Sequence, residues 1–288
     1  MQGPDVFTIL LNWNSSVDTL ACVKSVVAGS AGVKNEIVVV DNGSKKEPAS
    51  YLEVDDPEFV LIKNSENIGF AAGNNVGIRY ALNEGAKYIW ILNNDTEVAP
   101  GSLAAMVSRL DSDNDLGIVG SVIRFMANKD KIQCIGGGVV NYFSGKSVHV
   151  VEDLSSRSNF YLTGCSILVR REVFESVGLL NEDYFFLWED ADFSNSVRKC
   201  GWGIAVESLS VVFHKASESI KKCSPLQTYY YNRGAVCFFI NNCFFWPIPV
   251  TLGCAGRLVK RFLNRDWGGV IALMRGTFHG LFGKRGQL

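Results

Sequence analysis

The first half of this chain alternates short apolar runs with segments whose apolar residues recur at helical spacing. Leu20, Val23 and Val27, for example, share one face of a helix. Short strands that are apolar throughout, alternating with amphipathic helices, are typical of a mostly parallel sheet covered by helices on both faces. We therefore expect an α/β fold with a single Rossmann-like sheet. Its first strands are predicted at residues 6–11, 36–40, 59–62, 88–92 and 116–123.

Polar loops follow four of these predicted strands. In open α/β sheets, ligands bind beyond the carboxyl ends of the strands, so these loops predict a binding crevice at one edge. For any single loop the alternative is a solvated turn, because Asn and Asp bond their own backbone and tolerate turn dihedrals. The loops span residues 12–14, 41–44, 64–73 and 93–97.

The second half is less regular. We predict a β-hairpin within residues 132–151, a strand at 161–169 and a short helix at 171–177. Another helix is predicted to begin near Glu189, Asp190 and Asp192, where the helix dipole favours anions. The last strand leads into His214.

Composition excludes several classes of protein. The 288 residues are 47% hydrophobic and 20% charged, which indicates a globular core. A formal net charge of -1 argues against a nucleic-acid partner. The eight Cys form no Cys-x-x-Cys pair, so a zinc ribbon or redox motif is not indicated. The start, MQGPDVF, lacks a signal-peptide pattern, and we expect a protein on the cytoplasmic side.

Common nucleotide and hydrolase motifs are absent. The sequence has no Gly-x-Gly-x-x-Gly after its first strand, no P-loop and no Gly-x-Ser-x-Gly elbow. It does have an edge rich in Asn and Asp, a second carboxylate cluster, and His214 after a strand. Such oxygen ligands suit Mg²⁺ or Mn²⁺, which bind one or two carboxylates plus substrate phosphates. A metal ion bridging a diphosphate would neutralise charge on a nucleotide leaving group.

Six stretches together identify a known family. They lie in that family's order and cover roughly residues 6–220: LLNWNS (10–15), VVVDNGS (38–44), NIGFAAGNNVGI (67–78), ILNNDTEV (91–98), the segment 164–202 and VFHKASES (212–219). With these stretches the chain resembles a family 2 glycosyltransferase of the GT-A fold, and closely the bacterial rhamnosyltransferase-like branch. We accordingly assign residues 1–222 to a catalytic domain, with a nucleotide-sugar half over about 1–125 and an acceptor half over about 126–222.

The resemblance implies a role for individual residues. Asp190 matches the catalytic base, and Asp41 matches the acid that reads the nucleotide base. Asn93 and Asp95 take the positions of the D-x-D metal motif, with Asn in place of the first acid, and His214 matches a late His that completes the metal site. Asn74 stands where many relatives have Arg. The other implied donor-binding residues are Asn12, Asn14, Asn67, Gly69, Phe70, Asn75 and Asn94, and the acceptor-binding residues are Trp188, Glu189 and Asp192.

The implied function is inverting transfer of a sugar from dTDP-rhamnose or a UDP-sugar. The acceptor would be a hydroxyl of a glycan or lipid-linked glycan in cell-surface polysaccharide synthesis. Two alternatives stay open. A sugar-1-phosphate nucleotidyltransferase has a similar sheet, but needs a Gly-rich basic loop where this chain has NWNSSVDTL. A catalytically inactive scaffold of the same fold is the other.

The tail, residues 223–288, is predicted to be helical, first apolar and then basic. Residues 234–256 lack charged side chains, but Asn241, Asn242, Pro247 and Pro249 interrupt the run, so a single spanning helix is not favoured. One interpretation is a helical hairpin packed on the catalytic domain or on a second copy in a homodimer. The other, which we favour, is a peripheral anchor on the inner face of the cell membrane.

Overall fold

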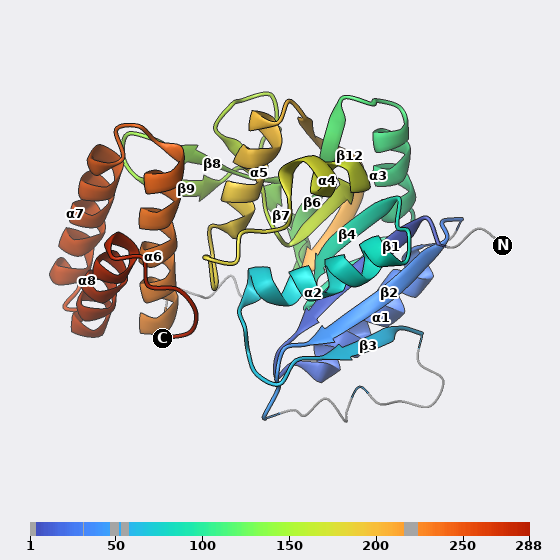
Figure 1. Ribbon diagram of the computed structural model, residues 1–288, viewed down its shortest axis with the longest axis horizontal. Helices are drawn as coiled ribbons and strands as arrows, with labels where there is room; N and C mark the ends of the chain where they lie inside the picture. Colours follow the sequence, from blue (N-terminus) through green and yellow to red (C-terminus); the bar gives the residue numbers. More distant parts are fainter. Residues whose placement is uncertain (1–3, 31, 47–51, 53–57, 216–223) are drawn as a thin grey trace.

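The computed structural model describes residues 4–30, 32–46, 52, 58–215 and 224–288. A mixed sheet forms its centre, with strand order β3-β2-β1-β4-β11-β6-β12-β5 and with β7 paired to β6 (Figure 1). Neighbours among β3, β2, β1 and β4 are parallel, as are β6 and β12, whereas β11 is antiparallel to both β4 and β6. The predicted α/β sheet is confirmed. Its strands are β1 (Val6–Asn12), β2 (Asn35–Asp41), β3 (Val60–Lys63), β4 (Tyr88–Asn93), β5 (Thr96–Val98), β6 (Leu116–Phe125), β7 (Asn128–Ile135), β11 (Ser166–Arg170) and β12 (Gly203–His214).

Helices cover both faces of this sheet. One core cluster contains side chains of α1 (Ser16–Gly29) and α3 (Ser102–Asp111), such as Val23 and Met106. A second cluster contains side chains of α2 (Phe70–Asn83), α4 (Arg171–Val177) and α5 (Glu189–Lys199). The strands between them are buried almost throughout, which explains why they read as continuous apolar runs.

A small second sheet adds to the predicted fold. It has the order β10-β8-β9, formed by β8 (Gly137–Asn141), β9 (Lys146–His149) and β10 (Phe160–Leu162). The strand predicted at 161–169 is wrong as one element. The chain leaves the small sheet after Leu162 and enters the main sheet as β11 at Ser166. Gly164 lies within the break, and a Gly inside an apolar strand pattern often marks such an interruption.

Three helices form the tail: α6 (Pro225–Asn242), α7 (Pro247–Leu263) and α8 (Trp267–Leu281). Helix α6 lies next to the α/β part, and α7 and α8 lie on its far side (Figure 1). The apolar run 234–256 is divided between α6 and α7. Pro247 is the first residue of α7, a position where its missing N–H costs nothing. In the described part of the chain, no helix is both long and apolar enough to cross a bilayer. The predicted domain boundary at 222/223 lies outside the described residues.

Helix α6 is packed firmly onto the α/β part. The ring of Trp188 lies 5.1 Å from that of Phe238 and 5.7 Å from that of Phe239. At the end of α6, Asn242 donates to Asp192 Oδ1 at 2.7 Å and accepts from Asn195 at 2.6 Å. These bonds give Asn242, a polar residue within the apolar run, a structural role.

Candidate active site

The ends of β1 and β2 bring two predicted donor-binding residues into contact. Asn12 and Asp41 are register partners, and the Asn12 amide donates to Asp41 Oδ1 at 2.7 Å. The Ser44 hydroxyl donates to the same oxygen at 2.6 Å, and both Asn12 and Asp41 are buried. Asp41 Oδ2 accepts the Ser44 backbone N–H at 3.2 Å. The carboxylate is thus held in one orientation, with lone-pair capacity left for a ligand donor.

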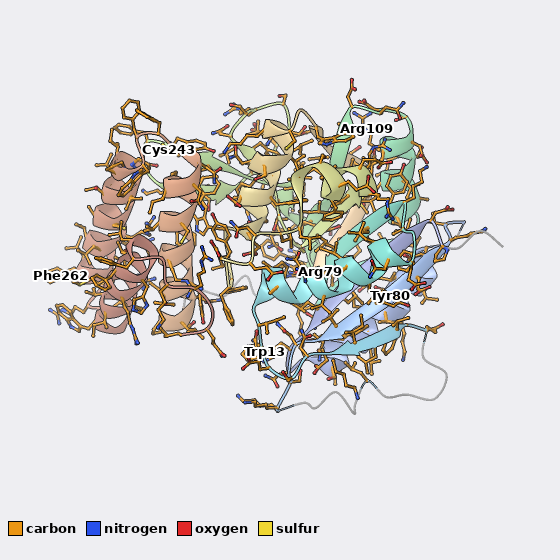
Figure 2. All side chains as sticks on the ribbon, viewed as in Figure 1. Trp13, Arg79, Tyr80, Arg109, Cys243 and Phe262 are labelled. Carbon is orange, nitrogen blue, oxygen red and sulfur yellow. The ribbon has the colours of Figure 1, made fainter. Side chains whose placement is uncertain are left out.

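Asn14 and Asn94 hold the neighbouring loops. Asn14 adopts a φ of 53°, and its carbonyl oxygen accepts the backbone N–H groups of Lys45 and Lys46, both at 2.8 Å. Asn94 donates to the Thr19 hydroxyl at 2.8 Å. Trp13, beside Asn14, lies half exposed at this end of the sheet (Figure 2). Direct contact of Asn14 or Asn94 with the donor stays a prediction.

The loop before α2 is shaped by backbone geometry. Asn67 accepts from Asn42 at 3.0 Å and from the Gly69 N–H at 2.9 Å. Gly69 has a φ of 98°, and a Cβ added there would lie 2.7 Å from the carbonyl oxygen of Phe185. That oxygen accepts the Phe70 N–H at 2.7 Å. Only Gly therefore fits this close approach between the donor loop and the segment that precedes α5.

Asn75 has a supporting position rather than an open one. Its side chain is fully buried, donates to the Leu180 carbonyl and to Glu182, and accepts the Leu180 N–H at 3.1 Å. These bonds tie α2 to the segment before α5. Because these bonds use its side-chain groups, direct contact of Asn75 with the donor stays a prediction.

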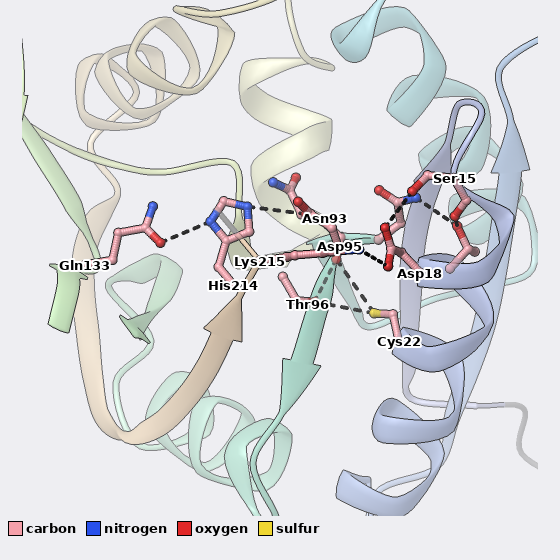
Figure 3. A network of polar contacts seen from close by, with 11 residues as sticks. Ser15, Asp18, Cys22, Asn93, Asp95, Thr96, Gln133, His214 and Lys215 are labelled. Carbon is pink, nitrogen blue, oxygen red and sulfur yellow. Dashed lines mark hydrogen bonds and ion pairs between the residues drawn. The ribbon is translucent and has the colours of Figure 1, made fainter. Parts of the chain in front are cut away.

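Asp95 and His214 lie together where β4 turns into β5 and β12 ends. His214 pairs in register with Thr96, which brings its Nε2 within 3.3 Å of Asp95 Oδ1 (Figure 3). On the other side of the ring, His214 Nδ1 lies 3.1 Å from Gln133 Oε1. The Lys215 N–H donates to the Asp95 carbonyl at 3.0 Å. Two of the three predicted metal ligands are therefore in contact.

The chemistry of this pair fits a divalent cation. Burial raises the pKa of Asp95, but the hydrogen bond and charge of His214, with a backbone N–H and the charge of Lys215, outweigh it and leave the pKa below its usual value. If Nδ1–H donates to Gln133 and Nε2 carries no proton, the Nε2 lone pair of His214 can bind a metal ion in place of its hydrogen bond to Asp95. Among the described residues, no group of three or more His, Cys, Asp or Glu side chains is arranged to hold a metal ion.

Asp190 lies in the first turn of α5 and accepts two backbone hydrogen bonds. Its Oδ2 accepts the Gly164 N–H at 3.1 Å, and its Oδ1 accepts the Ala191 N–H at 2.8 Å. Burial raises the pKa of Asp190 above its usual value, although these N–H groups and the charge of His149 oppose the shift. A half-buried carboxylate with a raised pKa is suited to proton transfer.

Two consecutive residues connect Asp190, the predicted base, to Asn93 of the predicted metal motif. Gly164 donates to Asp190, and the carbonyl of the next residue, Cys165, accepts the Asn93 N–H at 2.9 Å. A Cβ on Gly164 would also lie 3.4 Å from the Phe70 ring. The break between β10 and β11 thus brings Asn93, Asp190 and Phe70 around one short backbone segment.

The three predicted acceptor residues are largely covered. Trp188 is only 4% exposed and packs against α6, so the expected stacking on an acceptor sugar is not supported by this arrangement. Asp192 is buried and accepts from Tyr184 and Asn242. Glu189 is buried too. Its pKa lies well above the usual range because of burial and the neighbouring Asp190 charge.

Four residues of this site were not predicted from sequence. Gly164 and Cys165 carry their contribution through the backbone, Phe185 through its carbonyl, and Gln133 through a bond to His214. Gly164 was detectable in principle as a Gly inside a strand pattern. Gln133 gave no such indication, because a polar residue on a partly exposed strand is unremarkable in sequence.

A family model matches this arrangement. The chain belongs to glycosyl transferase family 2, whose model matches residues 8–178. This confirms the family suggested by the sequence stretches, and the matched segment includes Asp41, Asn93 and Asp95. The matched segment ends before Asp190.

Curated relatives extend the comparison. The low-salt glycan biosynthesis hexosyltransferase Agl10 of Haloferax volcanii is 26% identical over 68% of this chain, which spans 62% of that relative. The dTDP-rhamnosyl transferase RfbF of Shigella flexneri is 25% identical over 84% of this chain and 82% of its own length. The N-acetylglucosaminyl-diphospho-decaprenol L-rhamnosyltransferase of Mycobacterium tuberculosis is 26% identical over 62% of this chain and 66% of its own length. The similarity to rhamnosyltransferases is confirmed.

Solved structures confirm the GT-A fold. The mannosyltransferase PcManGT from Pyrobaculum calidifontis, in complex with GDP-Man and Mn²⁺, superposes with a TM-score of 0.63 over 99% of this chain and 89% of that one, at 15% identity. The structure of GalNAc-T7 with UDP, GalNAc and Mn²⁺ superposes with a TM-score of 0.65 over 85% of this chain and 49% of that one, at 17% identity. Both are glycosyltransferases crystallised with a nucleotide and Mn²⁺.

Proposed function

We propose that this protein is an inverting, metal-dependent glycosyltransferase that uses a nucleoside-diphosphate sugar. The observation that carries the proposal is the link through Gly164 and Cys165, whose backbone hydrogen bonds join the proposed base Asp190 to Asn93 of the proposed metal motif. Proximity of a proton acceptor to a site for a diphosphate is what a direct displacement requires. Asp95, His214 and Asn93 would hold Mg²⁺ or Mn²⁺, which would neutralise charge developing on the diphosphate.

In this mechanism Asp190 takes the proton from the acceptor hydroxyl as its oxygen attacks the anomeric carbon. The bond from that carbon to the diphosphate oxygen breaks, and the electron pair leaves with the nucleotide. One carboxylate suffices, unlike the pair that a glycosidase needs. Gly164 N–H orients Asp190, while Asn12 and Ser44 hold Asp41 against the base of the donor.

For the donor we propose dTDP-rhamnose first and UDP-hexoses second. For the acceptor we propose a hydroxyl of a glycan or lipid-linked glycan in cell-surface polysaccharide synthesis. The support is the activity for which two relatives are named, one a dTDP-rhamnosyl transferase and the other a rhamnosyltransferase acting on a decaprenol-linked acceptor. Because a lipid-linked acceptor resides in the membrane, we also propose that the protein acts at the inner face of the cell membrane. We retain 1–222 as the catalytic domain and 223–288 as its tail.

The test is a panel of nucleotide sugars assayed with Mn²⁺, with Mg²⁺ and with a chelator, following release of the nucleoside diphosphate. The proposal expects release from one donor class, dependent on the metal and increased by a lipid-linked acceptor. Release of pyrophosphate from a nucleoside triphosphate and a sugar 1-phosphate would instead identify a nucleotidyltransferase. Absence of turnover with every donor, despite folded protein, would favour the inactive scaffold.

A further inference from the structure

The two outermost helices each expose a row of large apolar side chains. In α7 the row recurs at positions 248, 252, 259 and 262, and in α8 at 267, 271, 274, 278 and 281. These spacings lie on one face of each helix. We call this surface the outer stripe. Its members are between 43% and 76% exposed: Ile248, Leu252, Val259, Phe262, Leu263, Trp267, Ile271, Met274, Phe278, Leu281 and Phe282.

The rows of the two helices meet at the turn between them. The rings of Phe262 and Trp267 lie 5.3 Å apart in an edge-to-face arrangement. Phe262 lies at the margin of the molecule farthest from the α/β part (Figure 2). Beyond the other end of α7, Phe244 and Phe245 are exposed and pack on each other. The apolar surface therefore continues across two helices and an adjoining turn.

The inner faces of these helices are already occupied. A Cβ on Gly276 would lie 2.4 Å from the Tyr229 carbonyl oxygen, so α8 packs closely on α6. On α7, Arg257 donates to the Gly145 carbonyl at 2.9 Å and to Asn232 at 2.7 Å. Because the opposite faces of α7 and α8 pack against the rest of the protein, the outer stripe is the face that is exposed to solvent. Exposed patches of this kind generally mark an interaction site.

Cations border the outer stripe. Lys260, Arg265, Arg275 and Lys284 are exposed, and none has an acidic side chain of the described residues within ion-pair distance. Asp266 is the one acid of residues 224–288, and Arg261 engages it. The outer stripe is therefore an apolar surface with a positively charged border. A binding partner that complements it would be apolar and carry negative charge.

We propose that the outer stripe of α7 and α8 docks in the plane of an anionic lipid surface. Apolar side chains would enter the interface, while the bordering cations contact lipid phosphates. Because no helix among the described residues can cross a bilayer, the attachment is peripheral. A second copy fits less well: a two-fold interface through the stripe would bring like cations together without an acid to pair them.

The proposal is tested by flotation of the full-length protein with vesicles of phosphatidylcholine alone and of phosphatidylcholine with phosphatidylglycerol. We expect binding to the anionic vesicles that falls with salt. Replacing Arg265 and Arg275 by Gln should weaken that binding by about 30-fold, since each cation near such a surface contributes a factor of about five. Replacing Phe262 and Ile271 by Gln should weaken it by at least about tenfold.

The matched control replaces Val17 and Leu209 by Gln, because both are highly exposed apolar residues on the α/β part. This control should float as the unchanged protein does, and thermal melting should confirm that every variant is folded. Equal flotation with neutral and anionic vesicles would show that the protein does not require anionic lipid, and would overturn that element of the proposal. Absence of flotation of the unchanged protein would overturn lipid docking. So would a dimer of the unchanged protein, seen by light scattering, that becomes a monomer when Phe262 and Ile271 are replaced. The assay requires no turnover, so this inference and the proposed function can fail separately.

Discussion

The ring of Phe185 stacks on that of Tyr230, with centroids 5.0 Å apart and planes 19° from parallel. The same Phe185 accepts the Phe70 N–H through its carbonyl. Tyr230 belongs to α6, and Phe70 begins α2 directly after the loop of Asn67 and Gly69, so Phe185 connects the tail to the predicted donor site. Phe185 and Tyr230 belong to one small apolar cluster, with Tyr229 and Ala272, that joins the tail helices to the segment before α5.

Tyr230→Leu should therefore affect the donor site as well as stability. Loss of the stacked ring is expected to cost about 1–3 kcal/mol of unfolding free energy and to raise the donor KM severalfold. Tyr230→Phe is the control, because it keeps the ring and removes only the hydroxyl that accepts the Leu288 N–H. Chemical denaturation and donor kinetics check this. Equal effects of the two substitutions would show that the stacking is unimportant.

Gly69→Ala should impair the donor loop beyond its effect on backbone strain. The added Cβ would meet the Phe185 carbonyl at 2.7 Å, so the loop must move. Gly85→Ala provides the matched control, since Gly85 also has a positive φ, of 88°, but nothing within 4 Å of an added Cβ. Both substitutions carry a cost for the positive φ, and the cost should be larger for Gly69, because its φ of 98° and ψ of 172° lie in a region that essentially only Gly adopts. Only Gly69→Ala should weaken nucleotide binding in calorimetry, and unchanged binding would contradict the role of this loop.

Asp95→Ala should abolish metal-dependent binding of UDP or dTDP. The carboxylate is the one anionic ligand of the predicted metal site, and the two neutral ligands that remain, Asn93 and His214, are too few to hold the ion without it. Asp18→Ala is a suitable control, because Asp18 lies in the same polar network and pairs with Lys215 but is not a predicted ligand (Figure 3). The measurement is calorimetric titration with and without Mn²⁺. Persistence of the Mn²⁺ effect in Asp95→Ala would remove Asp95 from the site.

The pH dependence of turnover should report the raised pKa of Asp190. A base must be deprotonated to act, so kcat should fall as the pH falls through the pKa of Asp190. Burial places that pKa above the ordinary Asp value, and the acid limb should have its midpoint above that value too. A midpoint at or below the ordinary value would show that another group, or another step, controls the acid limb.

Much of the fold was predictable because local pattern and burial agree. Strands β1, β2 and β4 are apolar on both faces, and their polar ends directly mark the crevice. The interruption at Gly164 was not predicted, because the residues on both sides of it are apolar and buried and continue one pattern. Only tertiary context, the passage from one sheet to another, divides that run.

The site was predictable where side chains carry the chemistry and less so where the backbone does. Asp95 and His214 were identified as partners, and they are in contact. In contrast, Trp188 carries an aromatic ring that sequence cannot assign to either surface or core, and α6 covers it. Asp192 likewise reads as a site acid, but its carboxylate is used by Asn242 to hold the tail.

The central claim is that Asp190 is the base of a transfer site beside the metal motif. The most direct measurement is the single-turnover transfer rate of Asp190→Asn with saturating donor, Mn²⁺ and acceptor. The amide keeps the shape and can still accept the Gly164 N–H, but it cannot take a proton. We predict near-normal donor affinity and a rate about 10²–10⁴-fold lower. A near-normal rate in a variant that binds donor normally would contradict the account and place the base on another residue.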